Sequence, residues 1–286
     1  MTGPLLEIDH VSRSFGGRGL LSRRRVLAVD DISLCLDSAR AEVLAVVGES
    51  GSGKSTLARL ILNLLSPGQG QIRFRGLDLR RIRDTRTRQE FMKAVQPVFQ
   101  NPFEAFNPMK RIDRYLMATA ARVAGVADDA ARQRAAEKAL NDVGLSLAEI
   151  RGRFPHELSG GQLQRIAIAR ALIPGPSLLV ADEPVSMIDA SLRASIVNLL
   201  RDLRDRLAVS VIYITHDLAT AYYVSDRILI MQRGRVVESG VAREVLDNPQ
   251  HPYSRLLKQS VLSPDVPANP GARLRDDPST TEVSHA

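Results

Sequence analysis

The sequence predicts an α/β fold in which a core of parallel strands and helices follows an antiparallel β layer and is interrupted by an α-helical insertion. Three observations support this prediction. Residues 43–47 and 178–181 are short apolar runs, typical of parallel strands buried on both faces. Residues 5–15 and 26–36 alternate between apolar and polar positions, as antiparallel strands do. Residues 113–143 are rich in Ala, Leu, Arg and Glu and poor in β-branched residues, which favours helix.

The composition is that of a folded protein with a sizeable core. The chain has 286 residues, 44% of them hydrophobic, enough for one large domain or two small ones. No apolar run approaches the roughly 18 residues of a membrane helix, and the N-terminus lacks the layout of a signal peptide. We therefore expect a cytosolic chain. A single cysteine excludes an internal disulfide framework and a cysteine-ligated cluster.

The net charge of +7 is carried by 34 arginines against 5 lysines, spread over the whole chain. Such a charge could attract nucleic acid or an anionic membrane surface. The densest clusters, residues 23–25 and 80–83, have no interleaved aromatic residues on which bases could stack. We interpret the arginines as solvated surface and expect no nucleic-acid partner.

The first two strands are predicted at residues 5–15 and 26–36, separated by a loop rich in Gly and Arg whose role the sequence leaves open. Cys35 lies in the alternating run of residues 32–36, and we expect it to pack in this β layer.

A glycine-rich segment joins the apolar run of residues 43–47 to an amphipathic run of residues 57–65, and it consists of Gly48, Glu49, Ser50, Gly51, Ser52, Gly53, Lys54, Ser55 and Thr56. Its glycines let backbone N–H groups turn inward around phosphate oxygens, and the helix start adds its dipole. Lys54 can reach the β and γ phosphates, and the Ser55 hydroxyl can hold Mg²⁺. A flexible Gly/Ser loop would explain the glycines but not a lysine followed by two hydroxyls at a helix start. The segment predicts binding of a nucleoside triphosphate.

After the first helix, residues 70–75 alternate again and residues 94–100 return to an extended pattern, so that Gln100 ends a strand. Pro102 and Pro108 then punctuate a loop before the helical stretch. We place the helical insertion at about residues 101–160.

The second half of the chain brings polar residues to helix starts and strand ends. Ser159, Gly160, Gly161 and Gln162 begin a strong helix-forming run. The strand of residues 178–181 is followed by Asp182 and Glu183, an amphipathic helix, the strand of residues 211–214 and His216. The carboxyl edge of a parallel sheet is where ligands bind.

The last elements are a hairpin at residues 228–238, turning at Arg233-Gly234, and a tail beyond Leu262. The tail is rich in Pro, Asp, Ser and Thr, so we expect it to be disordered.

With the phosphate loop, these strand ends form a candidate hydrolytic site. Asp182 is a candidate Mg²⁺ ligand, and Glu183 can polarise the attacking water. An Asp-Glu pair is common on surfaces, but the four apolar residues before it argue against a solvated face. His216 alone would more often be a satisfied core or surface histidine, but after a strand that should neighbour Asp182 it can touch the γ phosphate. The Gln100 amide could reach Mg²⁺ or the water.

These residues resemble the ATP-binding subunits of ABC transporters over residues 1–262. The stretch of residues 158–162 is similar to the family signature, which acts in trans: the helix start and Ser159 of one subunit cap the γ phosphate held by Lys54 of the other. The resemblance implies a P-loop NTPase (RecA-like) core that uses ATP and Mg²⁺. It also implies one ATPase domain over residues 1–262, which precedes the tail at residues 263–286 that the composition predicts to be disordered.

The resemblance extends to further single residues. Gln100 looks like the Q-loop residue, His216 like the switch histidine and Asp189 like the D-loop aspartate. Residues 186–188 depart from the Ala-Leu that more often precedes that aspartate. Phe15 resembles the aromatic residue that stacks on adenine, and a core phenylalanine is the alternative.

Residues 98–108 and 248–257 resemble oligopeptide and dipeptide importer ATPases. The resemblance implies a subunit that hydrolyses ATP and powers import by dimer closure, peripheral on the cytoplasmic face of the inner membrane. Its partners would be permease subunits, a second ATPase subunit (itself or a related chain) and, indirectly, a solute-binding protein. Some relatives carry C-terminal cysteines for an iron–sulfur cluster; none occurs here, so no cluster is expected.

We expect the permease to dock around Phe103 and Phe106, an apolar pair in the loop directly after Gln100. The alternative is that both rings anchor the insertion to the core. Other functions considered are import of a sugar or metal chelate, a soluble ABC-type ATPase acting on DNA or ribosomes, and a small-molecule kinase. The segment between Gln100 and residue 158 is too short for the heptad insertion of chromosome-type members, and a kinase leaves His216 without a role. The transported solute and the choice between homodimer and heterodimer stay open.

Overall fold

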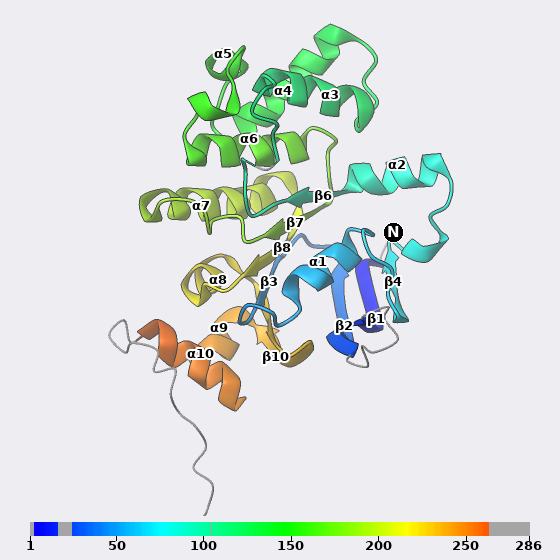
Figure 1. Cartoon of the computed structure of the whole chain (residues 1–286), viewed down its shortest axis with the longest axis vertical. Coiled ribbons are helices and arrows are strands. Elements are labelled where there is room, and N and C mark those ends of the chain that lie inside the picture. The colour runs from blue at the N-terminus through cyan, green and yellow to red at the C-terminus, as the bar shows by residue number, and fades with distance from the viewer. Residues whose placement is uncertain (1–2, 17–24, 104, 263–286) are drawn as a thin grey trace, which may run out of the picture.

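The computed structural model describes residues 3–16, 25–103 and 105–262 (Figure 1). The tail that the sequence predicts to be disordered, residues 263–286, and most of the Arg-rich loop lie outside the described residues. Within them, the strands form two sheets, and the helices between residues 112 and 157 gather at one end of the molecule (Figure 1). No helix of the described part is both long and apolar enough to cross a membrane.

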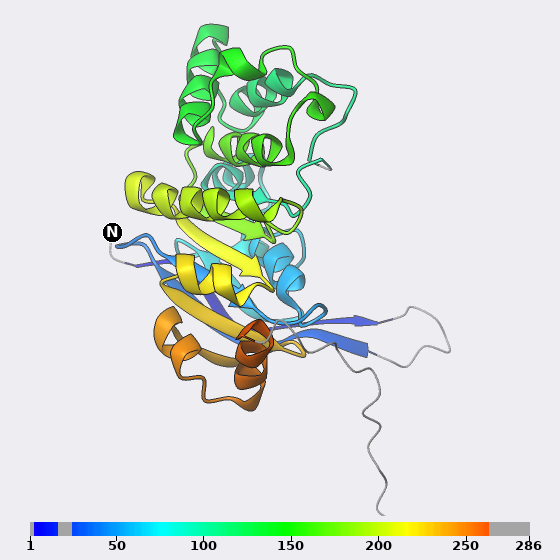
Figure 2. The same cartoon turned by 90° about the vertical axis from the view of Figure 1, so that its left-hand side faces the viewer.

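The antiparallel layer predicted at the N-terminus is present. Its strand order is β2-β1-β4-β5, and its strands are β1 (Pro4–Gly16), β2 (Arg25–Asp37), β4 (Gln69–Phe74) and β5 (Leu77–Asp78). The far ends of β1 and β2 project from the body as a hairpin (Figure 2). Ile32, Leu34 and Leu36 are buried, whereas Cys35 is exposed. The prediction that Cys35 packs in the layer was wrong, because alternate side chains of a strand point to opposite faces.

The second sheet is parallel except for one edge strand, which is the last strand along the chain. Its order is β10-β9-β3-β8-β7-β6, and its strands are β3 (Val43–Val47), β6 (Val95–Val98), β7 (Leu178–Asp182), β8 (Ser210–Thr215), β9 (Arg227–Gln232) and β10 (Arg235–Val241). β7 pairs with β8, as expected, and β10 returns antiparallel to β9. β6 ends at Val98, so Gln100 lies two residues beyond the strand rather than at its end.

The predicted helices are present as α1 (Lys54–Ile61), α3 (Ile112–Arg122), α4 (Asp129–Asp142), α6 (Gly160–Leu172) and α7 (Ala190–Leu207). The described residues also form helices that were not predicted individually: η1 (Leu79–Arg81), α2 (Thr85–Ala94), α5 (Leu147–Ile150), η2 (Pro155–Glu157), α8 (Leu218–Val224), α9 (Ala242–Asp247) and α10 (Pro252–Leu262). The helical stretch of residues 113–143 is two helices: Gly125 turns the chain at φ +76°, and Asp128 caps α4 by accepting from the Ala131 N–H.

The first helix is shorter than its apolar pattern suggested. α1 ends at Ile61, and Asn63 takes the left-handed conformation at φ +54°, a common way to end a helix. Leu64 is consequently 62% exposed instead of continuing the buried face.

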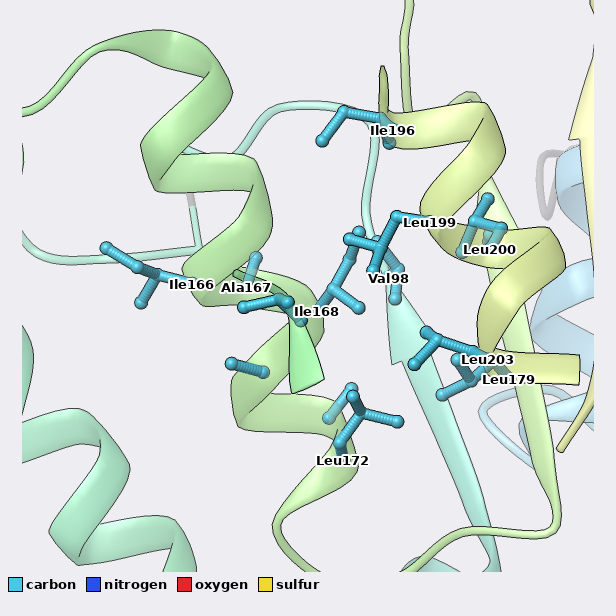
Figure 3. Packing of buried hydrophobic residues seen from close by; sticks show 14 of the residues in the cluster. Val98, Ile166, Ala167, Ile168, Leu172, Leu179, Ile196, Leu199, Leu200 and Leu203 are labelled. Atoms are coloured by element: carbon cyan, nitrogen blue, oxygen red, sulfur yellow. The ribbon is translucent and has the colours of Figure 1, made fainter. Parts of the chain in front are cut away.

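The parallel sheet is buried on both faces, which explains its near-continuous apolar strands. On one face, Leu44 and Val46 pack with α1 and the antiparallel sheet. On the other, α6 and α7 pack over β6 and β7, where Ile168, Val98 and Leu199 meet (Figure 3). Each such buried side chain contributes about 1.5–3 kcal/mol relative to exposure. This packing sets the carboxyl edge of the sheet, where the candidate site lies.

Candidate active site

The segment Gly48–Thr56 forms a tight loop between β3 and α1. Two of its glycines are required by space as well as by backbone conformation. A Cβ at Gly48 would lie 2.2 Å from the Met231 carbonyl oxygen, and one at Gly53 would lie 2.1 Å from the Ala28 carbonyl oxygen. Gly53 has φ +105°, a region that residues with side chains avoid. The loop is thus pressed against β2 and β9.

Lys54 is 5% exposed, and its ammonium donates to the carbonyl oxygens of Gly48 (2.6 Å) and Glu49 (2.8 Å). Burial lowers the pKa of Lys54, and the nearby Glu183 and Asp182 carboxylates oppose that shift. α1 has no side-chain cap at its N-terminus and no acidic residue in its first turn. Its free N–H groups and dipole therefore favour an anion beside a cation that is already in place.

A cavity of about 510 Å³ opens at this loop. Gly51, Lys54, Ser55, Gln100 and Glu183, all predicted site residues, line it. The fold thus brings the phosphate loop, Gln100 and Glu183, which are far apart in sequence, to one space.

Asp182 ends β7 with its Oδ1 atom buried and without a hydrogen-bond partner. Burial raises the pKa of Asp182, and a hydrogen bond with the Ser55 side chain works in the opposite direction. A buried unpaired carboxylate oxygen beside a serine hydroxyl suits Mg²⁺, which takes oxygen ligands and completes its shell with water and phosphate. The described residues hold no group of three or more His, Cys, Asp and Glu side chains for a metal, so phosphate or water oxygens would have to contribute.

Glu183 and His216 meet across the ends of neighbouring strands. The Glu183 carboxylate lies 2.8 Å from Nδ1 of His216. Glu183 has φ +49°, and its N–H donates to the Ile214 carbonyl at 2.8 Å, which holds this unusual backbone in place. The Glu183 side chain is 18% exposed and the His216 side chain 61%, so the pair faces outward from the sheet edge.

The signature-like residues 159–162 lie at the start of α6 and do not line the cavity at the phosphate loop. Ser159 caps α6, its hydroxyl accepting from the Gln162 N–H at 3.2 Å while Gln162 accepts from the Ser159 N–H at 3.1 Å. Gly161 packs on α7, where a Cβ would lie 2.9 Å from Leu192. Asp189 is exposed at the start of α7 and makes no capping bond. Neither Ser159 nor Asp189 lines the cavity of the phosphate loop, so one chain does not bring the two candidate anion-binding helix starts together.

Phe15 is 41% exposed, so the alternative of a core phenylalanine was wrong. It pairs in register with Val26, which lines the cavity, but it does not itself line it. The Arg13 guanidinium lies 5.3 Å from its ring centroid. Its role toward adenine stays a proposal.

Phe103 and Phe106 separate in the structure. Phe103 is 47% exposed, whereas Phe106 is 1% exposed, packed edge-to-face on Tyr115 and beneath the Arg170 guanidinium. The expectation that both rings form a docking surface was wrong for Phe106, because it belongs to the core that joins the helices to the sheet.

Several contacts to the loop had no clear sequence signal. Arg233 lines the cavity from the β9–β10 turn, and Gly234 N–H donates to the Ser52 carbonyl at 2.9 Å. Tyr253 accepts a hydrogen bond from the Glu49 N–H at 2.9 Å. All three come from residues 233–253, at least 177 positions after Thr56 in the chain.

A larger cavity, about 700 Å³, lies at the opposite edge of the parallel sheet, where Glu42 and Asp226 precede β3 and β9. Its lining residues include two ion pairs, Arg227 with Glu42 and Arg204 with Asp226. None of the predicted site residues lines it. The predicted site residues Lys54, Ser55, Gln100 and Glu183 line the smaller cavity instead, which makes it the candidate active site.

Two family models match the chain. Residues 29–186 match the family described as ABC transporter, and residues 237–285 match the C-terminal region of oligopeptide/dipeptide transporters.

Curated relatives are similar over most of the chain. A putative peptide import ATP-binding protein of Brucella ovis is 40% identical over 93% of this chain and 81% of its own length. The oligopeptide transport ATP-binding protein AppF of Bacillus subtilis is 39% identical, covering 90% of this chain and 78% of that protein. The dipeptide transport ATP-binding protein DppF of Haemophilus influenzae is 40% identical, over 87% and 76%.

Solved structures show the same fold. A dimeric post-hydrolysis state of the ATP-binding cassette MJ0796, bound to ADP and Pi, aligns with a TM-score of 0.71 and 25% identity, covering 83% of this chain and 99% of that one. CbiO1 from Clostridium perfringens, part of the ABC transporter complex CbiONQ, aligns with a TM-score of 0.73 and 24% identity over 91% and 95%.

Proposed function

Because this chain belongs to the ABC transporter family, as an ATPase of the ATP-binding cassette type, we propose that it powers a membrane importer of oligopeptides or dipeptides. The observation that carries the choice of solute is the match of residues 237–285 to the C-terminal region of oligopeptide/dipeptide transporters. The nucleotide site itself says nothing about the solute, so import of a sugar or metal chelate is the second candidate. The absence of stacking aromatics among the arginine clusters argues against an ATPase acting on nucleic acid.

Substrate binding is assigned to the phosphate loop. The loop N–H groups and the start of α1 hold the phosphates, and the Lys54 ammonium, oriented by the Gly48 and Glu49 carbonyls, directs its remaining N–H to the β and γ phosphates. Ser55, Asp182 and Gln100 would hold Mg²⁺, whose charge would offset that of the phosphates. The unpaired Asp182 oxygen and the hydrogen bond from Ser55 support this assignment.

Hydrolysis is assigned to Glu183 and His216. The Glu183 carboxylate orients the attacking water and takes up its proton, since it lies in the cavity beside Lys54. His216 holds that carboxylate through Nδ1. Its Nε2 has no hydrogen-bond partner among the described residues, which leaves it available to the γ phosphate.

A complete site requires a second subunit. Ser159 and the start of α6 lie outside the cavity that Lys54 lines, so they are proposed to cap the γ phosphate bound by a partner subunit. The dimeric neighbour with ADP and Pi supports this arrangement. We treat residues 1–262 as one ATPase domain with a helical subdomain at about residues 101–160, peripheral to the membrane beside permease subunits.

The test is complementation of a strain that lacks the gene. Wild-type chain should restore growth on short peptides as the only nitrogen source and uptake of a labelled tripeptide, and Glu183→Gln should restore neither. Normal peptide uptake in the deletion strain, together with loss of uptake of a sugar or metal chelate, would overturn the peptide assignment.

A further inference from the structure

The phosphate loop receives a hydrogen-bond partner from the last helix of the described chain. Tyr253, in the first turn of α10, is 4% exposed, and its hydroxyl oxygen accepts from the Glu49 N–H at 2.9 Å. Its ring packs in a core cluster that includes Ala45 and Val47 of β3, the strand that leads into the loop. Tyr253 therefore bonds to the loop and belongs to the core cluster in which β3 packs.

This contact bears directly on Lys54. The Glu49 N–H belongs to the same peptide unit as the Gly48 carbonyl, and that carbonyl accepts from the Lys54 ammonium at 2.6 Å. In a planar trans peptide, N–H and C=O point in opposite directions. Holding the N–H toward Tyr253 thus keeps the carbonyl directed away from Tyr253, toward Lys54. The peptide unit between Gly48 and Glu49 is therefore held at both polar groups, its N–H by Tyr253 and its carbonyl by Lys54.

Tyr253 is itself anchored to the sheet. The Glu238 carboxylate on β10 accepts from the backbone N–H groups of Gln250 (2.8 Å) and His251 (3.0 Å), and His251 Nδ1 accepts from the Tyr253 N–H at 3.2 Å. Burial raises the pKa of Tyr253, which keeps its hydroxyl neutral. The start of α10 is therefore fixed independently of the loop that it braces.

We propose that Tyr253 is a positioning residue for the nucleotide site: its hydroxyl fixes the peptide unit between Gly48 and Glu49, and through it the Lys54 ammonium, before nucleotide arrives. The inference rests on the nucleotide-binding role proposed above for Gly48–Thr56. A loop that is already ordered loses less freedom when a ligand binds, so the contact raises affinity for ATP and ADP alike. This role of Tyr253 gives the C-terminal region a part in nucleotide binding.

The test compares two Tyr→Phe variants that keep the ring and remove one hydroxyl. Tyr253→Phe leaves the Glu49 N–H without its partner, and Kd for ATP and ADP should rise about tenfold, with KM rising in parallel and kcat changing less. Hydrogen exchange of the loop amides in the nucleotide-free protein should become faster. The matched control is Tyr115→Phe, since the Tyr115 hydroxyl also accepts from a backbone N–H, that of Asn107 at 2.7 Å. It should leave nucleotide affinity unchanged.

A double-mutant cycle separates positioning from general loosening. In a Lys54→Ala background, Tyr253→Phe should weaken nucleotide binding by less than in the wild type, because part of its effect passes through Lys54. An equal loss of nucleotide affinity in both backgrounds would contradict the proposed action of Tyr253 through Lys54. If wild-type protein binds ATP and Tyr253→Phe binds it within twofold, this inference alone fails. If wild-type protein does not bind ATP, the proposed function fails and the inference with it.

Discussion

At the level of single residues, the candidate site gathers buried polar groups that the protein alone leaves poorly paired. Asp182 Oδ1 and the Ser52 hydroxyl are buried without a partner, and Lys54 is bonded only to backbone carbonyls. Such groups cost stability in the free protein, and a phosphate and a cation would satisfy them. Removing one of these groups should therefore impair function and make the nucleotide-free protein more stable.

Asp182→Asn should make the nucleotide-free protein more stable, with Tm higher by about 2–4 °C. Burial raises the pKa of Asp182 above its ordinary value of 3.8, so ionisation is disfavoured in the folded state. The gain should be small below pH 3.8, where the carboxyl group is largely protonated whether folded or unfolded, should grow as pH rises from 3.8 toward the folded-state pKa, and should level off above that pKa. Urea unfolding between about pH 4.5 and pH 8 measures it. The exposed Asp202→Asn should show no such trend, and lower stability of Asp182→Asn at pH 8 would contradict the interpretation.

Glu183→Gln should keep ATP binding and lower turnover at least 100-fold, because an amide preserves the shape and the contact with His216 but cannot accept the proton of the attacking water. Lys54→Ala should weaken ATP binding to a measurable degree and abolish turnover, since it removes the cation of a largely enclosed phosphate site. Phosphate release and retention of labelled ATP on a filter distinguish the two variants. Loss of binding in Glu183→Gln would mean that Glu183 holds the backbone turn at φ +49° rather than the water.

At the level of elements, the loop between β6 and α3 combines an anchor and an exposed ring. Phe106 is fixed in the core with Tyr115, while Phe103 remains exposed close after Gln100, which lines the nucleotide cavity. A partner that presses on this loop could thus move Gln100. The exposed part of the loop is our proposed docking site for the permease.

Phe103→Asp should abolish recruitment to permease-containing membranes while Tm and ATP affinity stay near wild type. Phe106→Asp should instead destabilise the protein by at least about 3 kcal/mol, because it places a charge in the apolar core. Membrane flotation and thermal unfolding provide the two readouts. Normal recruitment of Phe103→Asp would exclude this ring from the docking surface.

At the level of the whole molecule, the two candidate anion sites of one chain stay apart. Lys54 lines the cavity and Ser159 does not, which supports our proposal that each complete site draws its two halves from different subunits. In a symmetric pair the same two surfaces meet twice, which gives two equivalent sites. Activity of the isolated subunit should then rise more steeply than linearly with its concentration.

Mixing Lys54→Ala with Ser159→Arg chains should restore activity that neither variant has alone. Each mixed dimer holds one intact site, and half of the dimers in an equal mixture are mixed, so about a quarter of wild-type turnover is expected. Phosphate release from the mixture measures it. Absence of recovery would contradict self-pairing and favour an obligate partner with a different ATPase chain.

The sequence predicted the elements better than it predicted side-chain surroundings. The alternating and apolar runs located the strands of both sheets, and β8 was correctly expected beside β7. The end of α1 was misplaced because Leu64 and Leu65 continue the apolar pattern, whereas the left-handed conformation of Asn63 ends the helix first. Phe106 and Cys35 were misjudged because exposure depends on which neighbouring element covers a residue.

By itself the sequence determined the glycine-rich loop at a helix start, the acidic pair after an apolar strand and the α/β order of elements, because these depend on neighbours within a few residues. Only the tertiary structure decided that Glu183 and His216 meet at 2.8 Å, that Phe106 is buried and that Tyr253 bonds to Glu49. Those contacts join residues far apart in the chain, and the packing of α7, α8 and α10 around the parallel sheet sets their distances. Local patterns carry no record of such packing, since many three-dimensional arrangements satisfy the same periodicity.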